Sequence, residues 1–453
     1  MINWIGMASR RKPQVLREVR HMAREVFHVG REFKRATEYR GRTLYKQSRM
    51  LGPGLIAGAA DDDAGGIATY SIIGATTGYA LTWLMLVSTP MLVVVQTICA
   101  RLGNITHKGL ATLMKEQYGI KLALCAALVL VIANVATISA DVSGMAVAAE
   151  LVTGIDWWYF VVPLSLLIIY VIIFKNFNTI QKVSLRLSLV LVAYVVAGVL
   201  AFPDWRNVLI STFVPKIDFS LPFITAAVGL LGTTITPYLF FWQTATEVEA
   251  KRTEKQLKKV DFDIFTGMIY SNIISYFIII SSGTILFPHL QQLGSVSNAP
   301  DPVRFIALAL KPVAGDYSFY LFAIGLFAAS VLAVVVLASS TAYVVSETMG
   351  WNRGLNKKLR QARKFYSVIA LSIMGGIAVL ATGIKPIDAM YYSQVLCGVL
   401  DPILLVMLIK LASDEKLMGV HALSGRWRAM AWATVGVITL FVVFLLRGIF
   451  LGS

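Results

Sequence analysis

The sequence predicts an all-α polytopic membrane protein. Of its 453 residues, 57% are hydrophobic and 15% are charged, whereas soluble globular chains average roughly 45–50% apolar and about 25% charged residues. The mean hydropathy is +0.70, and apolar stretches of about 20 residues, long enough to cross a bilayer as helices, recur along the chain. This composition argues against a soluble enzyme.

Eleven membrane spans are predicted. They lie near residues 51–75, 79–100, 122–152, 158–174, 185–202, 222–246, 264–287, 317–346, 366–384, 387–411 and 429–450. Several exceed 25 residues, so tilted helices or extensions beyond the bilayer are expected.

The distribution of positive charge predicts the orientation. Of the 41 lysine and arginine residues, 35 fall in the N-terminal tail and in alternate loops. By the positive-inside rule these segments are cytoplasmic, so an odd number of spans leaves the C-terminus outside. The net charge of +16 is then a consequence of topology, and we expect a monomeric multi-pass protein of the plasma (inner) membrane with no nucleic-acid partner.

The N-terminal tail, residues 1–48, is polar and basic, which argues against a cleavable signal peptide. Its valines recur at helical spacing between Pro13 and Gly30, which predicts a basic amphipathic helix on the cytosolic leaflet. The alternative is a partly disordered tail that serves only as a topology signal. The three cysteines, in apolar stretches, imply no disulfide framework.

Two spans contain helix-breaking sequences at corresponding positions. The first carries the run Asp61-Asp62-Asp63 before a glycine pair, and the sixth carries Pro237 after several threonines. Pro237 alone would suggest a simple kink, and the aspartates alone a solvated loop. Together, breaks in spans one and six are typical of transporters with inverted five-helix repeats, whose unwound segments form a midplane ion site. This predicts repeats at 49–202 and 222–411, followed by the eleventh span within 412–453.

The donor atoms at the two breaks predict the kind of ion. Carboxylate, hydroxyl and carbonyl oxygens suit Mg²⁺, Ca²⁺ or Mn²⁺, and neither break contains His, Cys or Met. No nucleophile and base set, nucleotide loop or soluble domain is evident, so we expect neither catalytic residues nor a cofactor other than the transported ion.

At these residues the chain resembles the natural resistance-associated macrophage protein (Nramp) family of divalent metal transporters, from Gly52 to about Leu411. Gly52-Pro53-Gly54 is followed by Asp63-Ala64-Gly65-Gly66, where the family has Asp-Pro-Gly-Asn. The run from Gly232 to Tyr238 matches the family's Gly-Ala-Thr-Val-Met-Pro-His, and Ser393-Gln394-Val395 matches its Leu-Ser-Gln-Val. The resemblance implies a LeuT-like fold and alternating access.

The departures from the family motif concern the metal ligands. Asp63 keeps the position of the metal-binding aspartate, and Ala60 and Thr233 stand where backbone carbonyls can bind metal. Gly66 replaces the asparagine ligand, and Thr236 replaces the methionine whose thioether favours transition metals. A wider, all-oxygen site suits an ion that keeps part of its water shell, and Mg²⁺ dehydrates reluctantly. The pattern resembles the Nramp-related magnesium transporter branch.

Other polar residues near the breaks are further candidates. Asp61 and Asp62 add charge absent from the usual motif, and we interpret them as groups that contact the ion through water or line its vestibule. Gln394 matches a family glutamine that can reach the ion during occlusion, and Tyr238 stands at a family histidine. For Asp141, proton handling and a buried hydrogen bond are both open.

Proton coupling is not expected. The family histidines after the proline of the sixth helix are replaced by Tyr238 and Gln243, and the third-helix aspartate aligns with Ile138. Neither a phenol nor an amide exchanges protons near neutral pH, which leaves Asp141 as an acidic remnant. The competing functions are a proton-coupled Mn²⁺/Fe²⁺ importer or a carrier of another hard ion such as Al³⁺, and a non-transporting membrane enzyme or receptor.

Overall fold

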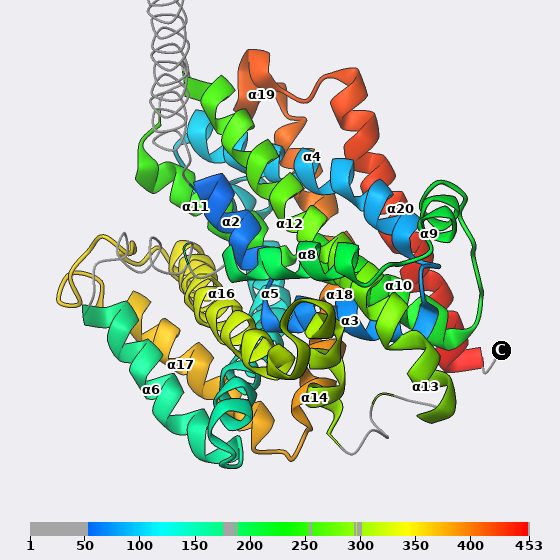
Figure 1. The fold of residues 1–453 in the computed structure, drawn as a ribbon. Coiled ribbons are helices and arrows are strands. Elements are labelled where there is room, and N and C mark those ends of the chain that lie inside the picture. Colours follow the sequence, from blue (N-terminus) through cyan, green and yellow to red (C-terminus); the bar gives the residue numbers. More distant parts are fainter. Residues whose placement is uncertain are drawn as a thin grey trace, which may run out of the picture. The chain divides into compact units, whose positions relative to one another are not determined.

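A computed structural model describes residues 53–174, 186, 189–252, 256–293, 296 and 301–451. Within these residues the regular elements are helices (Figure 1). The amphipathic helix predicted in the N-terminal tail lies outside the described residues. The described parts of the eleven predicted spans lie mainly on helices, which confirms the predicted fold class.

The first half of the bundle contains both short and long helices. They are α2 (Pro53–Asp61), α3 (Ala64–Thr77), α4 (Thr82–Thr106), α5 (Leu110–Thr153), α6 (Trp158–Phe174), α8 (Val192–Leu200) and α9 (Trp205–Phe213).

The second half begins with a second broken helix. Its elements and those that follow are α10 (Leu221–Thr234), α11 (Pro237–Ala250), α12 (Leu257–Ile285), α13 (Phe287–Leu293), α14 (Pro302–Ala307), α15 (Lys311–Ala314), α16 (Ser318–Met349), α17 (Arg363–Leu380), α18 (Pro386–Ala412), α19 (Glu415–Met418) and α20 (Gly425–Leu451).

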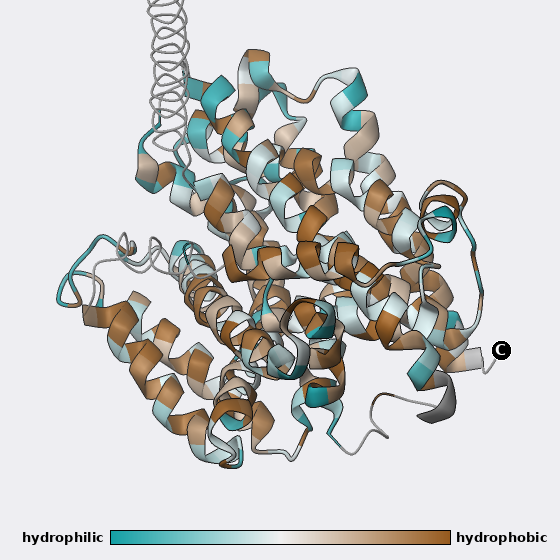
Figure 2. Ribbon diagram, in the orientation of Figure 1, coloured by the Kyte–Doolittle hydropathy of each residue, from teal (hydrophilic) through white to brown (hydrophobic). Residues whose placement is uncertain are grey.

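The lengths of the helices agree with eleven spans. Among the described residues, eight helical segments are long and apolar enough to cross a membrane. The segments Leu189–Leu200 and Trp205–Phe213, between which the chain bends by 113°, make a ninth if they form one span. The remaining two predicted spans are α6, which has 17 residues, and the broken pair α2 and α3. Figure 2 shows apolar residues along most of α6 and α17, as expected for helices that face lipid.

Both predicted breaks are present, and local chemistry explains each of them. Asp63 has extended backbone angles and is the N-cap of α3, where its side chain accepts a hydrogen bond from the amide of Gly66. Thr236 is the N-cap of α11, and Pro237 occupies the first turn, where its missing N–H costs nothing. The chain therefore leaves helical geometry at Asp62 in one repeat and at Ile235 in the other.

Helices α12 and α18, which both come from the second half of the sequence, pack against the first broken helix. Helix α12 packs against both α2 and α3, and α18 packs against α3, α5 and α10. The contact of α2 with α12 is backbone to backbone, because a Cβ atom added to Gly58 would lie 2.2 Å from the carbonyl oxygen of Gly267. These contacts place the two breaks in the buried centre of the bundle.

Candidate metal site

Asp63 is fully buried at the start of α3, and its carboxylate faces α18. Gln394 Nε2 donates to both oxygens, at 3.3 Å to Oδ1 and 3.2 Å to Oδ2, while the Gly66 amide also donates to Oδ1. Gln394 is itself buried, and its Oε1 atom has no hydrogen-bond partner in the described part of the chain. The structure therefore brings together the aspartate and the glutamine that the sequence predicts as ligands.

Gly66 and Thr233 meet beside this carboxylate. A Cβ atom on Gly66 would lie 2.8 Å from Thr233 Oγ1 and 3.1 Å from Asp63 Oδ1. Thr233 thus fills the space that a side chain at position 66 would need. Its hydroxyl oxygen is buried and lacks a hydrogen-bond partner among the described residues, so it is free to accept a cation.

The other predicted ligands at the breaks contact one another. Thr236 Oγ1 donates to Asp61 Oδ1 at 3.3 Å, and the Tyr238 hydroxyl donates to the Ala60 carbonyl oxygen at 2.8 Å. A phenol that already bonds the Ala60 carbonyl must share that oxygen with an ion or release it. In this conformation Asp63 and Thr233 have the more available oxygens.

Two residues of α12 belong to the site and were not predicted. Ser271 Oγ lies 3.2 Å from Asp61 Oδ2 and 3.1 Å from Asp62 Oδ1, so its single proton is shared between the two carboxylates, and Ser275 Oγ donates to Asp62 Oδ1 at 3.0 Å. Asp61 and Asp62 are each 1% exposed. The signal in the sequence was two serines four residues apart in an apolar helix, which places both hydroxyls on one face.

Asp141 reaches the same break from α5. Its Oδ1 atom accepts a hydrogen bond from the Ala64 amide at 3.0 Å. The first turn of α3 is therefore held by two carboxylates, Asp63 and Asp141, at the end where the helix dipole favours negative charge. Of the two predicted roles for Asp141, the buried hydrogen bond is present in the structure.

The donor set is mixed rather than purely acidic. Within the described ranges, no group of three or more His, Cys, Asp or Glu side chains is arranged to hold a metal ion. A metal at Asp63 would therefore draw its remaining donors from hydroxyl, amide and carbonyl oxygens or from water. Such neutral oxygen donors suit hard cations.

A cavity of about 740 Å³, here called the vestibule, lies beyond the C-terminal end of α3. It lies between the end of α3 and the starts of α10 and α18, and its lining includes Thr76, Phe223, Asp388 and Tyr391. Gln394 follows Tyr391 by about one turn of α18, but neither Gln394 nor Asp63 lines the vestibule, and both side chains are fully buried.

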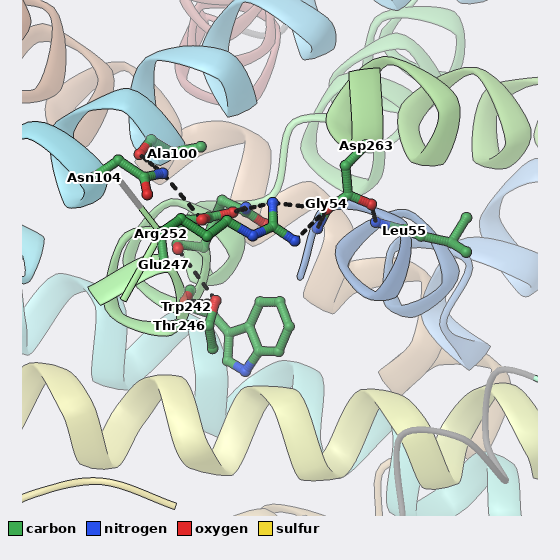
Figure 3. A network of polar contacts seen from close by, with 10 residues as sticks. Gly54, Leu55, Ala100, Asn104, Trp242, Thr246, Glu247, Arg252 and Asp263 are labelled. Atoms are coloured by element: carbon green, nitrogen blue, oxygen red, sulfur yellow. Dashed lines mark hydrogen bonds and ion pairs between the residues drawn. The ribbon is translucent and has the colours of Figure 1, made fainter. Parts of the chain in front are cut away.

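The opposite ends of the two broken helices, at the beginning of α2 and the end of α11, are joined by a buried polar network (Figure 3). Arg252 lies 3.6 Å from Glu247 and 3.3 Å from Asp263. Asp263 also accepts from the Gly54 amide at 3.0 Å, and Glu247 accepts from Asn104 at 3.0 Å. The network ties the beginning of α2 and the end of α11 to α4 and α12, so this side is closed while the vestibule is open.

Comparisons with known proteins agree with this architecture. The family model described as "Natural resistance-associated macrophage protein-like" matches residues 54–447. The divalent metal cation transporter MntH of Caldanaerobacter subterraneus is 26% identical over 433 residues, covering 92% of this chain and 96% of that protein. MntH of Bacillus subtilis is 24% identical over 408 residues, covering 88% and 91%.

Solved structures share the fold. A manganese transporter of Eremococcus coleocola has a TM-score of 0.69 at 19% identity, over 88% of this chain and 87% of that one. MhsT, solved with L-phenylalanine, has a TM-score of 0.57 at 15% identity, over 86% and 98%. The fold is therefore LeuT-like, with broken first and sixth spans. Because the family model matches the chain from residue 54 to residue 447, the protein belongs to the Nramp family.

Proposed function

We propose that this protein carries divalent metal ions across the membrane by alternating access, with Mg²⁺ as the main cargo and Mn²⁺ also permeating. The observation that carries this proposal is the pair of buried, unpartnered oxygens near Asp63. Thr233 Oγ1 and Gln394 Oε1 are buried beside it without hydrogen-bond partners among the described residues, and threonine replaces the family methionine at position 236. The site lacks the soft donor that retains transition metals.

The preference for Mg²⁺ follows from how this ion loses water. Mg²⁺ dehydrates reluctantly and usually keeps several waters when it is bound by one or two carboxylates. Asp63 supplies one carboxylate, and neutral oxygens from Thr233 and Gln394 can bind either the ion or its waters. Such a site holds the ion without demanding a complete protein cage, which also allows release on the other side.

The vestibule and the Arg252 network lie beyond opposite ends of the two broken helices, and the site residues between them are buried. If the N-terminus is cytoplasmic, the beginning of α2 and the Arg252 network lie inside, and the vestibule at the end of α3 lies outside. Because Asp63, Thr233 and Gln394 are fully buried, we infer an occluded state, closed towards the cytoplasm, of a monomeric carrier in the plasma membrane. Inward opening would require Arg252 to separate from Glu247 or Asp263.

A proton-coupled manganese or iron importer is the second candidate. The matched relatives are named divalent metal cation transporters, and one solved neighbour is a manganese transporter. These names support a divalent cargo in general, whereas the threonine at position 236 favours a harder ion than the methionine-containing motif does.

Uptake into liposomes distinguishes the two candidates. We expect the reconstituted protein to take up Mn²⁺, and we expect Mg²⁺ to inhibit this uptake at concentrations similar to those of Mn²⁺ itself. The measurement is ⁵⁴Mn²⁺ accumulation against increasing Mg²⁺, Mn²⁺ or Ca²⁺, with empty liposomes as the control. Inhibition by Mn²⁺ at concentrations about 100-fold lower than Mg²⁺, a difference of about 2.7 kcal/mol, would favour the manganese importer.

Proton coupling can be tested in the same liposomes. Asp141 accepts a hydrogen bond from the Ala64 amide, and the Gln243 amide donates to Glu247 at 3.0 Å. The groups bonded here to Asp141 and Glu247 are therefore amides, which do not exchange protons near neutral pH. We expect metal uptake without acidification of the lumen. Luminal acidification that scales with metal flux and disappears in Asp141→Asn would overturn this prediction.

A further inference from the structure

The side of the α2–α3 break that faces α12 contains an unused carboxylate oxygen. Asp62 Oδ1 accepts hydrogen bonds from Ser271 and Ser275 at 3.1 and 3.0 Å. The second oxygen, Oδ2, has no partner within the described part of the chain, although Asp62 is 1% exposed. An ionised oxygen that is buried and unpaired is strongly disfavoured, so this atom indicates a missing ligand.

This oxygen does not belong to the Asp63 site. The Asp63 carboxylate bonds to α3 and α18 through Gly66 and Gln394, whereas the partners of Asp62 both come from α12. Both oxygens of Asp61 have hydroxyl partners, Thr236 at Oδ1 and, at Oδ2, Ser271, whose single proton is shared with Asp62. Of the three aspartates, Asp62 is thus the one that faces α12 and has an oxygen without a hydrogen-bond partner among the described residues.

The four carboxylates around the break, when ionised, carry more negative charge than one divalent ion offsets. Asp61, Asp62, Asp63 and Asp141 are all buried here, and none of the ion pairs formed among the described residues includes them. A divalent ion at Asp63 would offset two of the four charges. Buried charges are normally paired or bound to metal, and the C-terminal end of α2 adds negative dipole potential next to Asp62.

We infer that Asp62, Ser271 and Ser275 form a second cation site, for a small hard monovalent ion of the sodium class. One carboxylate with two hydroxyls has a net charge of −1, which a monovalent ion neutralises. Serine hydroxyls and carboxylates are hard donors, and neither sulfur nor imidazole contributes to this group. This inference does not depend on which divalent metal the Asp63 site transports.

The test is binding of ²²Na⁺ to the purified full-length protein, measured beside ⁵⁴Mn²⁺ binding. We expect saturable Na⁺ binding that weakens about tenfold or more, about 1.4 kcal/mol, in Asp62→Asn and in Ser271→Ala/Ser275→Ala. Asp63→Ala should lose Mn²⁺ binding and keep Na⁺ binding. Ser281→Ala is the matched control, because this buried α12 serine donates instead to the Ala309 carbonyl. A failure of divalent transport would leave the Na⁺ result intact, so the two proposals fail separately.

Three results would overturn the inference. If the wild-type protein binds no Na⁺, Asp62 holds a proton instead. If Asp63→Ala is the one variant that abolishes Na⁺ binding, Na⁺ binds at the Asp63 site. Two Mn²⁺ ions per chain, with the second lost in Asp62→Asn, would make the second site divalent. Because the variants could fold poorly, the thermal unfolding midpoint of the wild type is also compared in NaCl and choline chloride. A higher midpoint in NaCl is expected, and equal midpoints would count against the site.

Discussion

Replacing Asp63 with alanine should abolish divalent metal uptake. Among the described residues, its carboxylate is the charged group that Gln394 contacts, so its loss leaves only neutral oxygens of Gln394 and Thr233 for the ion. A removed carboxylate ligand cannot be offset by hydroxyls or amides, because a dication needs negative charge in a buried site. The measurement is initial ⁵⁴Mn²⁺ uptake in liposomes with matched amounts of reconstituted protein.

The Asp63 experiment needs a control for folding, because the same side chain caps α3 through the Gly66 amide. Loss of an N-cap costs about 1 kcal/mol, which could lower the yield of folded protein. Asp63→Ser separates the two roles, since serine caps helices as well as aspartate does but brings no charge. We expect Asp63→Ser to fold like the wild type and still fail to transport. Wild-type uptake in either variant would refute the assignment.

Restoring the family ligands should move selectivity from Mg²⁺ towards Mn²⁺ and Cd²⁺, but only if room is made first. Asparagine at position 66 would collide with Thr233 Oγ1, because even a Cβ atom there lies 2.8 Å from it. The change to test is therefore Gly66→Asn with Thr233→Ala and Thr236→Met, which matches the family motif at all three positions. An added thioether favours softer ions, and we expect Cd²⁺ to gain about tenfold over Mg²⁺ in competition assays, about 1.4 kcal/mol.

Two further variants separate the causes of such a shift. Gly66→Asn alone should lose most uptake, because the asparagine and Thr233 compete for one space, and Thr233→Ala should restore it. Thr236→Leu in place of Thr236→Met fills similar volume without sulfur, so it should narrow the site without attracting Cd²⁺. An unchanged competition profile in the triple variant would place selectivity elsewhere, for example in Asp61 and Asp62.

Much of the fold could be predicted because its signals are local. Apolar runs of membrane length, a proline after a threonine-rich turn and three adjacent carboxylates each act within a few residues of chain. The breaks at Asp62 and Ile235 follow from capping and from the missing amide of Pro237. Matching breaks in the two halves predicted the LeuT-like fold correctly, while the central ion site stays a prediction.

The partners within the site could not be predicted in the same way. Ser271 and Ser275 lie more than 200 residues from Asp62, and nothing in their own segment shows which helix they face. The bond from Tyr238 to the Ala60 carbonyl likewise depends on how α11 approaches α2. Sequence reasoning therefore identified the residues of the breaks, while their division between α18 and α12 depends on helix packing.

The contact of Gly58 with Gly267 has a mechanical consequence for the transport cycle. Helix α12 touches both halves of the broken helix, so α2 and α3 cannot tilt independently unless one of these contacts slides. At Gly58 and Gly267 two bare backbones meet, and no side chains interlock that would have to be lifted over one another. At this interface α2 can therefore slide along α12 with little steric hindrance. A single methyl group there would push the two helices apart.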